Sequence, residues 1–302
     1  MQPLWGIDLG GTKIEGVVLE PGNPFKILAR TRVGTESEKG YEHILNQIKT
    51  LVQLLKEETG LQPTSIGMGT PGIIDPVTKT MKNSNTTCMN DKPFRSDIEA
   101  VLGVPVFTSN DANCFALAEA NLGIVPDVFP NAEVVVGLIL GTGVGGGIVV
   151  NNRVVQGKQG IAGEWGHNFL DESGGKCYCG RIGCVETVIS GPALQRFYAD
   201  RSGQALKLPE IVKRYQEGND PVAKETMDRL IHFFGKALAV VINILDPDAI
   251  VVGGGVGNIE LLYNEGVEAL KTRVFNNKPE ISLLKPKLGD SAGVFGAAML
   301  TA

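Results

Sequence analysis

The sequence predicts an α/β protein of two lobes that repeat one plan. The first third of its 302 residues shows three strand-like segments, a helical one and a further strand, at residues 4–9, 14–20, 25–33, 41–58 and 65–69. A similar run, later followed by a long helix to Leu245 and another helix, has strand-like segments at residues 133–140, 147–152, 153–157 and 249–254. Both runs contain an apolar strand, a turn of glycine and threonine and a second apolar strand. This echo indicates a duplicated architecture.

The boundary between the lobes is predicted in the segment 119–132, which carries the proline and glycine residues of a connection. We therefore expect a smaller N-terminal lobe over residues 1–118 and a larger C-terminal lobe over residues 119–289. The final segment, 290–302, has small residues at helical spacing. We expect it to pack back on the first lobe.

Composition favours small-molecule chemistry. The chain is 43% hydrophobic and 20% charged, with a formal net charge of −5, so it lacks the broad basic footprint of a nucleic-acid binder. No basic segment followed by an apolar run opens the chain, and the most apolar later segment, 233–245, is interrupted by Lys236 and Asn243. We expect a cytoplasmic protein with no membrane partner. Its five cysteines, an odd number, are then reduced thiols.

A glycine turn follows the first strand. Asp8 ends that strand, and Gly10, Gly11, Thr12 and Lys13 come next. Backbone N–H groups of such a turn can approach a phosphate closely because glycine has no Cβ, and a neighbouring carboxylate can hold Mg²⁺ through water. A plain tight hairpin is the alternative interpretation.

Two further glycine clusters lie in the second half, at Gly141, Thr142 and Gly143 and at Gly254 and Gly255. Neither common nucleotide-binding pattern fits. The chain has no GxxxxGK[ST] string, and the GxGxxG match at 141–146 leads into a strand where a dinucleotide site requires a helix. Two strand–turn–strand phosphate clamps are typical of the actin and sugar-kinase class, with its ribonuclease H-like duplicated domains. The predicted fold is therefore this two-lobed α/β fold, with ATP and Mg²⁺ as its ligands.

Asn110 and Asp111 follow the strand-like segment 104–109 and precede a helical run. Polar side chains at a strand end gather where ligands bind in α/β proteins. Capping of the helix is the simpler role for Asp111, and a catalytic base is the alternative.

Residues 163–187 contain three cysteines and a histidine: His167, Cys177, Cys179 and Cys184. A Cys₃His set is a closed tetrahedral ligand set for structural zinc, and reactive surface thiols are the alternative. Glu164 lies three residues before His167, and Glu186 lies two after Cys184. We expect the metal to order a substrate-binding loop and to leave the chemistry to other groups, since four protein ligands leave no open position for water.

Together the motifs resemble the ROK family of repressors and sugar kinases over essentially the whole chain: DLGGTK, GTPG at 69–72, NDAN at 110–113, GTGVGGG at 141–147, GEWGH at 163–167, CYCGRIGCVE at 177–186 and DPDAIVVGGG at 246–255. The resemblance implies an ATP-dependent hexose kinase, a homodimer, in which Asp111 takes the proton from the 6-hydroxyl of the sugar. The sugar contacts that it implies are Gly72, Asn85, Asn110, Asp111, Glu164, His167 and Glu186.

The preferred sugar stays open at this point. Several strings look most like bacterial fructokinases that also accept mannose, so fructose or mannose is our first expectation, and glucose and N-acetylglucosamine are the alternatives. From another class, a noncatalytic sugar-sensing regulator, such as a sugar-responsive repressor, is the alternative. Repressors of the family carry an added N-terminal helix-turn-helix, and the phosphate-loop strand starts here at residue 4, which argues against that interpretation.

Overall fold

The computed structural model describes residues 2–22 and 24–302. Contacts divide the chain into unit 1, residues 1–128, 147–163 and 287–302, and unit 2, residues 129–146 and 164–286. The predicted lobes assigned 147–163 to the C-terminal side. These residues join unit 1 because their chain packs on it: a Cβ added at Gly147 would lie 2.6 Å from the carbonyl oxygen of Ala112.

Unit 1 is built on a five-stranded sheet of order β3-β2-β1-β4-β7. Its strands are β1 (Leu4–Leu9), β2 (Lys13–Glu20), β3 (Lys26–Gly34), β4 (Ile66–Thr70) and β7 (Val106–Asn110). Strands β1, β4 and β7 are parallel, with Asp8 opposite Gly69 and Thr70 opposite Asn110. Their carboxyl ends therefore meet at one edge of the sheet, where ligands bind in α/β proteins. A small hairpin, β5 (Ile73–Ile74) and β6 (Met81–Lys82), follows β4.

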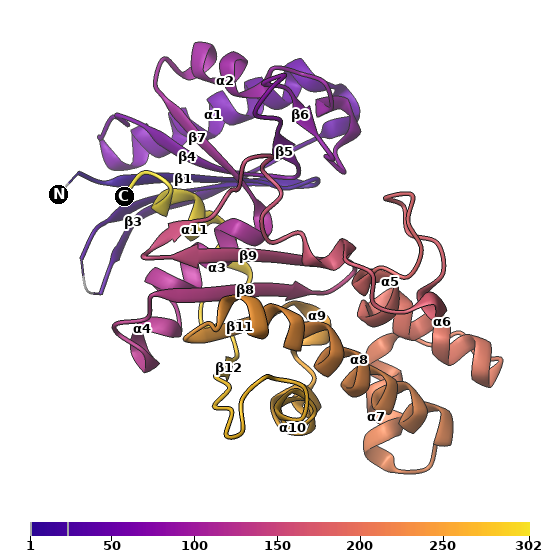
Figure 1. Ribbon diagram of the computed structural model, residues 1–302. Helices are drawn as coiled ribbons and strands as arrows, with labels where there is room; N and C mark the ends of the chain where they lie inside the picture. The colour runs from indigo at the N-terminus through magenta and orange to yellow at the C-terminus, as the bar shows by residue number, and fades with distance from the viewer. Residues whose placement is uncertain (1, 23) are drawn as a thin grey trace. The chain divides into compact units, whose positions relative to one another are not determined.

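Helices cover both faces of this sheet (Figure 1). On one face lie α1 (Tyr41–Thr59) and α2 (Phe94–Leu102), and on the other lie α3 (Asp111–Asn121) and α11 (Ala292–Met299), while α4 (Val125–Val128) follows α3. Ile44, Ile48 and Leu51 lie at the helical spacing that the sequence shows, and all are fully buried. Helix α11 approaches β4 so closely that a Cβ added at Gly67 would lie 1.8 Å from the carbonyl oxygen of Ala297.

A buried carboxylate joins two segments of unit 1 near the points where the chain leaves and re-enters it. Glu119 is 0% exposed and accepts hydrogen bonds from the backbone N–H groups of Ile124, Lys287 and Leu288, at 2.9 to 3.1 Å. Backbone donors satisfy the buried charge, as burial of a carboxylate requires.

Unit 2 contains the parallel strands β8 (Val134–Leu140), β11 (Ala249–Gly253) and β12 (Leu283–Leu284). They belong to a sheet of order β10-β9-β8-β11-β12, with β9 (Val144–Val150) and β10 (Arg153–Val154). The helices of this unit are α5 (Val185–Ile189), α6 (Gly191–Ser202), α7 (Leu208–Glu217), α8 (Pro221–Leu245), α9 (Gly254–Gly257) and α10 (Glu265–Lys271).

Short 3₁₀ turns complete the chain, at Ser37–Lys39, Thr87–Met89, Trp165–His167, Glu172–Gly174, Glu260–Tyr263 and Gly289–Ser291. Among the residues that the structure describes, no helix combines the length and the apolar character that a membrane crossing requires.

Candidate functional site

The first glycine turn is a closed hairpin between β1 and β2. The N–H of Gly10 donates to the carbonyl oxygen of Lys13 at 3.0 Å, and the hydroxyl of Thr35 donates to the carbonyl oxygen of Gly10 at 2.6 Å. Thr35, the residue after strand β3, thus braces the turn, while Gly11 and Thr12 at its tip are exposed. A rigid turn with exposed backbone N–H groups is the arrangement that a phosphate clamp needs.

Asp8, on β1 just before this turn, lies near the carboxylates of Asp111 and Glu15. Burial, then the charges of Asp111 and Glu15, raise the pKa of Asp8 from 3.8 to about 6, and Lys13 opposes the shift. Such a group of carboxylates fits Mg²⁺, because a hard cation prefers oxygen ligands and would relieve their repulsion. Sequence reasoning missed Glu15, which is 2% exposed and pairs with Arg32 at 3.0 Å. No local pattern indicated it, because its ion-pair partners lie on the neighbouring strand β3.

Removal of the Asp8 charge should stabilise the protein in the absence of nucleotide and Mg²⁺. A raised folded-state pKa means that ionised Asp8 destabilises the fold, so the penalty is absent below pH 3.8, grows as pH rises toward 6 and is complete above it. We expect Asp8→Asn to gain about 1–3 kcal/mol, or several degrees of Tm, at pH 7.5, and to gain less at pH 5. Differential scanning fluorimetry at both pH values measures this difference.

Asp91→Asn is the matched control, because Asp91 is exposed on the same unit. Its Tm should follow that of the wild type at both pH values. A Tm gain for Asp8→Asn that is equal at pH 5 and pH 7.5 would contradict the electrostatic explanation.

Asn110, and not Asp111, caps helix α3. The side-chain oxygen of Asn110 accepts from the N–H of Asn113 at 2.9 Å, and Asp111 is the first helical residue. One carboxylate oxygen of Asp111 accepts from the N–H of Ala112 at 2.8 Å. Asp111 is accessible to solvent, yet surrounding protein desolvates its carboxylate and raises its pKa. An accessible carboxylate with increased proton affinity suits a general base.

Gly72 lies between β4 and β5, and Asn85 lies on the loop after β6. Gly72 has no room for a side chain, since a Cβ there would lie 2.6 Å from the carbonyl oxygen of Lys82. The hydroxyl of Thr70 donates to the carbonyl oxygen of Gly72 at 2.8 Å. Asn85 is exposed on a loop in which the N–H of Ser84 donates to the side chain of Asn90. Asp8, Gly72, Asn110 and Asp111 therefore follow the carboxyl edge of one sheet.

In unit 2, the second and third glycine clusters adjoin. A Cβ added at Gly141, at the end of β8, would lie 3.9 Å from the nitrogen of Gly255, which follows β11. Gly254 has φ +85° and lies against the carbonyl oxygen of Leu140, 2.4 Å from where its Cβ would be, so only glycine fits. Gly255 is exposed. The two strand ends form one surface rich in accessible backbone.

Glu186 braces the turn that also carries Thr142 and Gly143. Its carboxylate accepts a hydrogen bond from the N–H of Val144 at 2.9 Å. The start of helix α5 is thereby joined to the second glycine turn. This bond links a predicted sugar contact to a predicted phosphate clamp within one unit.

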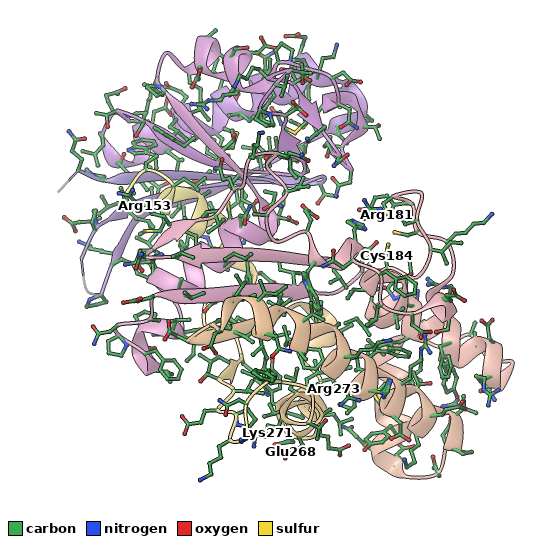
Figure 2. All side chains as sticks on the ribbon, in the orientation of Figure 1. Arg153, Arg181, Cys184, Glu268, Lys271 and Arg273 are labelled. Carbon is green, nitrogen blue, oxygen red and sulfur yellow. The ribbon has the colours of Figure 1, made fainter. Side chains whose placement is uncertain are left out.

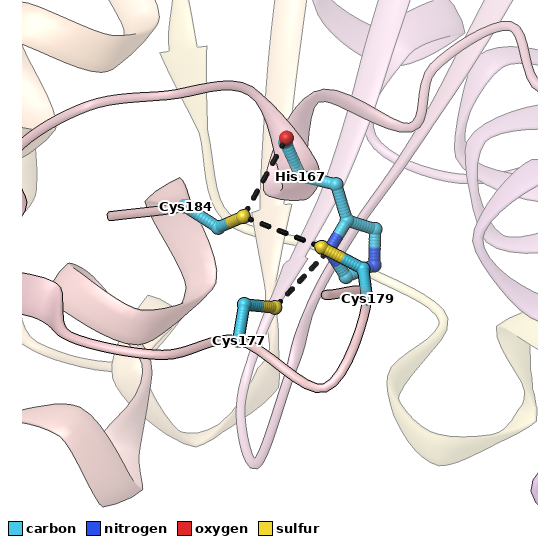
Figure 3. Close-up of side chains that lie close together, drawn as sticks. All are labelled: His167, Cys177, Cys179 and Cys184. Atoms are coloured by element: carbon cyan, nitrogen blue, oxygen red, sulfur yellow. Dashed lines mark hydrogen bonds between the residues drawn. The ribbon is translucent and has the colours of Figure 1, made fainter. Parts of the chain in front are cut away.

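The four predicted metal ligands lie together (Figure 3). One ligand atom from each of His167, Cys177, Cys179 and Cys184 lies within 4.8 Å of the others. The Sγ of Cys177 is 3.6 Å from Nδ1 of His167, and the Sγ atoms of Cys179 and Cys184 are 3.6 Å apart. Ligands on a tetrahedral zinc ion with bonds of about 2.0–2.3 Å have spacings of this size. The donor set therefore fits a structural Zn²⁺.

The Cys₃His cluster holds the elements that present Glu164 and Glu186. Cys184 is the N-cap residue of α5, and His167 ends the turn that begins after Glu164. Arg181, labelled beside Cys184 in Figure 2, donates to the carbonyl oxygen of His167 at 3.5 Å. Sequence reasoning missed Tyr178, whose hydroxyl lies 2.9 Å from Nε2 of His167. This contact uses the nitrogen that faces away from the Cys177 thiol.

Comparison with known proteins identifies the relatives of the chain. The profile of the ROK family matches residues 4–302. N-acetyl-D-glucosamine kinase from Pasteurella multocida is 37% identical over 98% of both chains. The crystal structure of ROK hexokinase from Thermus thermophilus has a TM-score of 0.88 at 32% identity and covers 99% of this chain and 97% of its own. A ROK glucokinase from Streptomyces griseus, in complex with glucose and AMPPNP, has a TM-score of 0.76 at 29% identity over 99% of both. The predicted two-lobed actin-like α/β fold class is confirmed.

Proposed function

The chain belongs to the ROK family, and we propose that it transfers the γ-phosphoryl group of ATP to the 6-hydroxyl of N-acetyl-D-glucosamine. The relatives support the coarser statement that it is an ATP-dependent sugar kinase. The single observation that carries the reaction is Asp111, a desolvated but accessible carboxylate at the end of β7.

The choice of sugar departs from our first expectation. Sequence strings favour fructose or mannose, but several curated relatives at 34% to 37% identity are named N-acetyl-D-glucosamine kinases. N-acetylglucosamine, the alternative sugar, therefore fits these relatives better than fructose or mannose. Sequence motifs shared across a family reflect the chemistry that all its members need. The preference for one sugar over another depends instead on a few side chains around the sugar.

In the proposed reaction, Asp111 accepts the proton of the sugar hydroxyl as the oxygen attacks the γ-phosphorus and ADP leaves. Backbone N–H groups of three glycine clusters bind the phosphates: Gly10 to Lys13, Gly141 to Gly143, and Gly254 and Gly255. The N–H groups of Gly10 and Gly141 close their own turns, so the donors are the other N–H groups of these clusters. Asp8 would hold Mg²⁺ through water, and that ion supplies charge neutralisation at the phosphates. Gly72, Asn85, Asn110, Glu164, His167 and Glu186 are the proposed sugar contacts, because amides and carboxylates pair with hydroxyls. We also propose a homodimer, which light scattering would show as twice the 32.1 kDa of the chain.

A coupled ADP-release assay over N-acetylglucosamine, glucose, mannose and fructose tests the function. We expect the highest kcat/KM for N-acetylglucosamine, by roughly 10-fold or more, because a site that hydrogen-bonds a substituent rejects sugars without it. A preference for fructose would overturn the choice of sugar. Sugar binding without any ADP release would favour the noncatalytic regulator instead.

A further inference from the structure

A cavity of about 620 Å³ lies within unit 1, along the edge strand β7. Its lining includes Gly72, Arg95, Phe107, Ser109, Asn110 and Asn113. Gly72 and Asn110 are proposed sugar contacts, so the cavity adjoins the proposed acceptor site. Its volume lies within the range of small-molecule sites, about 300–1,000 Å³.

Two residues of this lining each have a buried side-chain atom without a hydrogen-bond partner: Oγ of Ser109 and Oδ1 of Asn113. Ser109 is 8% exposed and Asn113 is 4% exposed. Native proteins satisfy such atoms, because a buried polar group that loses water without gaining a partner is costly. The hydroxyl can donate or accept, and the amide oxygen accepts only. Together they complement a ligand that offers one donor and one acceptor.

The charges around the cavity favour a neutral ligand. Both acidic residues that line it are paired, Asp75 with Lys82 at 2.8 Å and Glu99 with Arg95 at 3.3 Å. Lys79 also lines the cavity, but its side chain is exposed, so water solvates the ammonium group and screens its charge. Phe107, which is 44% exposed, adds an apolar wall beside the Arg95 guanidinium, whose carbon lies 6.0 Å from the ring centroid.

We propose that this cavity binds a neutral extension of the acceptor sugar, a group that donates a hydrogen bond to Asn113 and accepts one from Ser109. This inference rests on the proposed function and deepens it. Two sources share the chemistry: the acetamido substituent of an N-acetylhexosamine, and a second glycosyl ring linked to the phosphorylated hexose. The first needs one N–H donor and one carbonyl acceptor, and the second supplies both through hydroxyls.

The experiment compares Ser109→Ala and Asn113→Ala with the wild type on three probes: glucose, N-acetylglucosamine and a β-linked glucose disaccharide. Both kcat/KM and the equilibrium dissociation constant, from calorimetry, are measured for each. Loss of one hydrogen bond to a neutral group should weaken binding of the extended sugar by roughly 3- to 10-fold, relative to the binding of glucose. Ser96→Ala is the matched control, since this hydroxyl also lines the cavity but already donates to the carbonyl oxygen of Pro93 at 2.9 Å.

The quantity compared is the affinity or kcat/KM for each extended sugar divided by that for glucose. A fall in this ratio for N-acetylglucosamine in the two variants supports the acetamido source, and a fall for the disaccharide supports the second ring. Ser109→Ala removes a single oxygen. If the folded variant keeps the wild-type ratios for both extended sugars, the inference is overturned, and water is the partner of Oγ of Ser109 and Oδ1 of Asn113. A wild type that binds these sugars without phosphorylating them would defeat the proposed function, while the dissociation constants still test the cavity. Equal affinity for all three probes in the wild type would overturn the inference as well.

Discussion

Asp111→Asn should lower kcat for sugar phosphorylation by roughly 10²- to 10⁴-fold, the usual contribution of a positioned general base. Asparagine preserves the volume of the side chain and an oxygen that can accept from the N–H of Ala112, the bond that holds the carboxylate at 2.8 Å. Helix α3 should therefore form normally, because its cap is Asn110. The amide cannot take the proton of the attacking hydroxyl. KM for the sugar should change much less than kcat, since binding depends on several other groups.

The pH profile distinguishes a base from a structural carboxylate. Because desolvation raises the pKa of Asp111 above the ordinary 3.8, kcat of the wild type should fall as pH decreases toward that raised value. This acid limb should be missing from the residual activity of Asp111→Asn. Asp127→Asn is the matched control, because Asp127 is exposed and pairs with Lys287. Full turnover by Asp111→Asn would show that another group acts as the base.

Local pattern was enough to predict the elements that carry the site. The helix predicted over 41–58 is α1 at Tyr41–Thr59, and the strand predicted at 65–69 is β4 at Ile66–Thr70. Both follow from periodicity and from turn residues, which act within a few positions of the chain. Strand ends were predicted for the same reason. Asp8 and Asn110 follow runs of apolar residues, and parallel pairing brings them to one edge.

Features that depend on distant pairs were not predicted. Buried Glu15 forms ion pairs with Arg30 and Arg32 on β3, and the sequence pattern does not reveal that these three side chains meet. Ser109 and Asn113 look like ordinary polar residues around NDAN until burial leaves their oxygens without partners. The return of 147–163 to unit 1 depends on packing against α3, which no local signal reports.

The Cys₃His cluster is an intermediate case, because ligand spacing is local while its consequence is not. Within 18 residues the chain supplies every donor, so the set was predictable from sequence alone. We expect any effect of the cluster on substrate binding to depend on Glu186 of α5, whose carboxylate accepts a hydrogen bond from the N–H of Val144 on β9. A metal ion that fixes α5 would therefore act both on Glu186, a predicted sugar contact, and on the second glycine turn, a predicted phosphate clamp.

Cys184→Ser should remove bound zinc, lower Tm by roughly 10 °C and raise KM for the sugar by roughly 10- to 100-fold. Cys184 is buried and caps α5 two residues before Glu186. Without the metal, the segment between His167 and Cys184 keeps backbone hydrogen bonds such as that from Gly183 to Gly175, but it loses the cross-link between its two ends. We therefore expect Glu164 and Glu186 to lose their fixed positions. The proposed base, Asp111, lies on unit 1 and is unchanged in this variant, so kcat at saturating sugar should fall less than kcat/KM. Metal analysis of the purified wild type should give about one zinc per chain.

Cys88→Ser separates this effect from the loss of any thiol, because Cys88 lies outside the cluster on unit 1. It should retain zinc, Tm and KM. Chelation of the wild type provides a second route to the same state without mutation, and restoration by added Zn²⁺ should return Tm and KM together, since one set of ligands orders the loop in both measurements. A zinc-free protein that binds sugar with the wild-type KM would mean that backbone bonds such as Leu170 to Gly183, at 2.7 Å, order the loop without the ion.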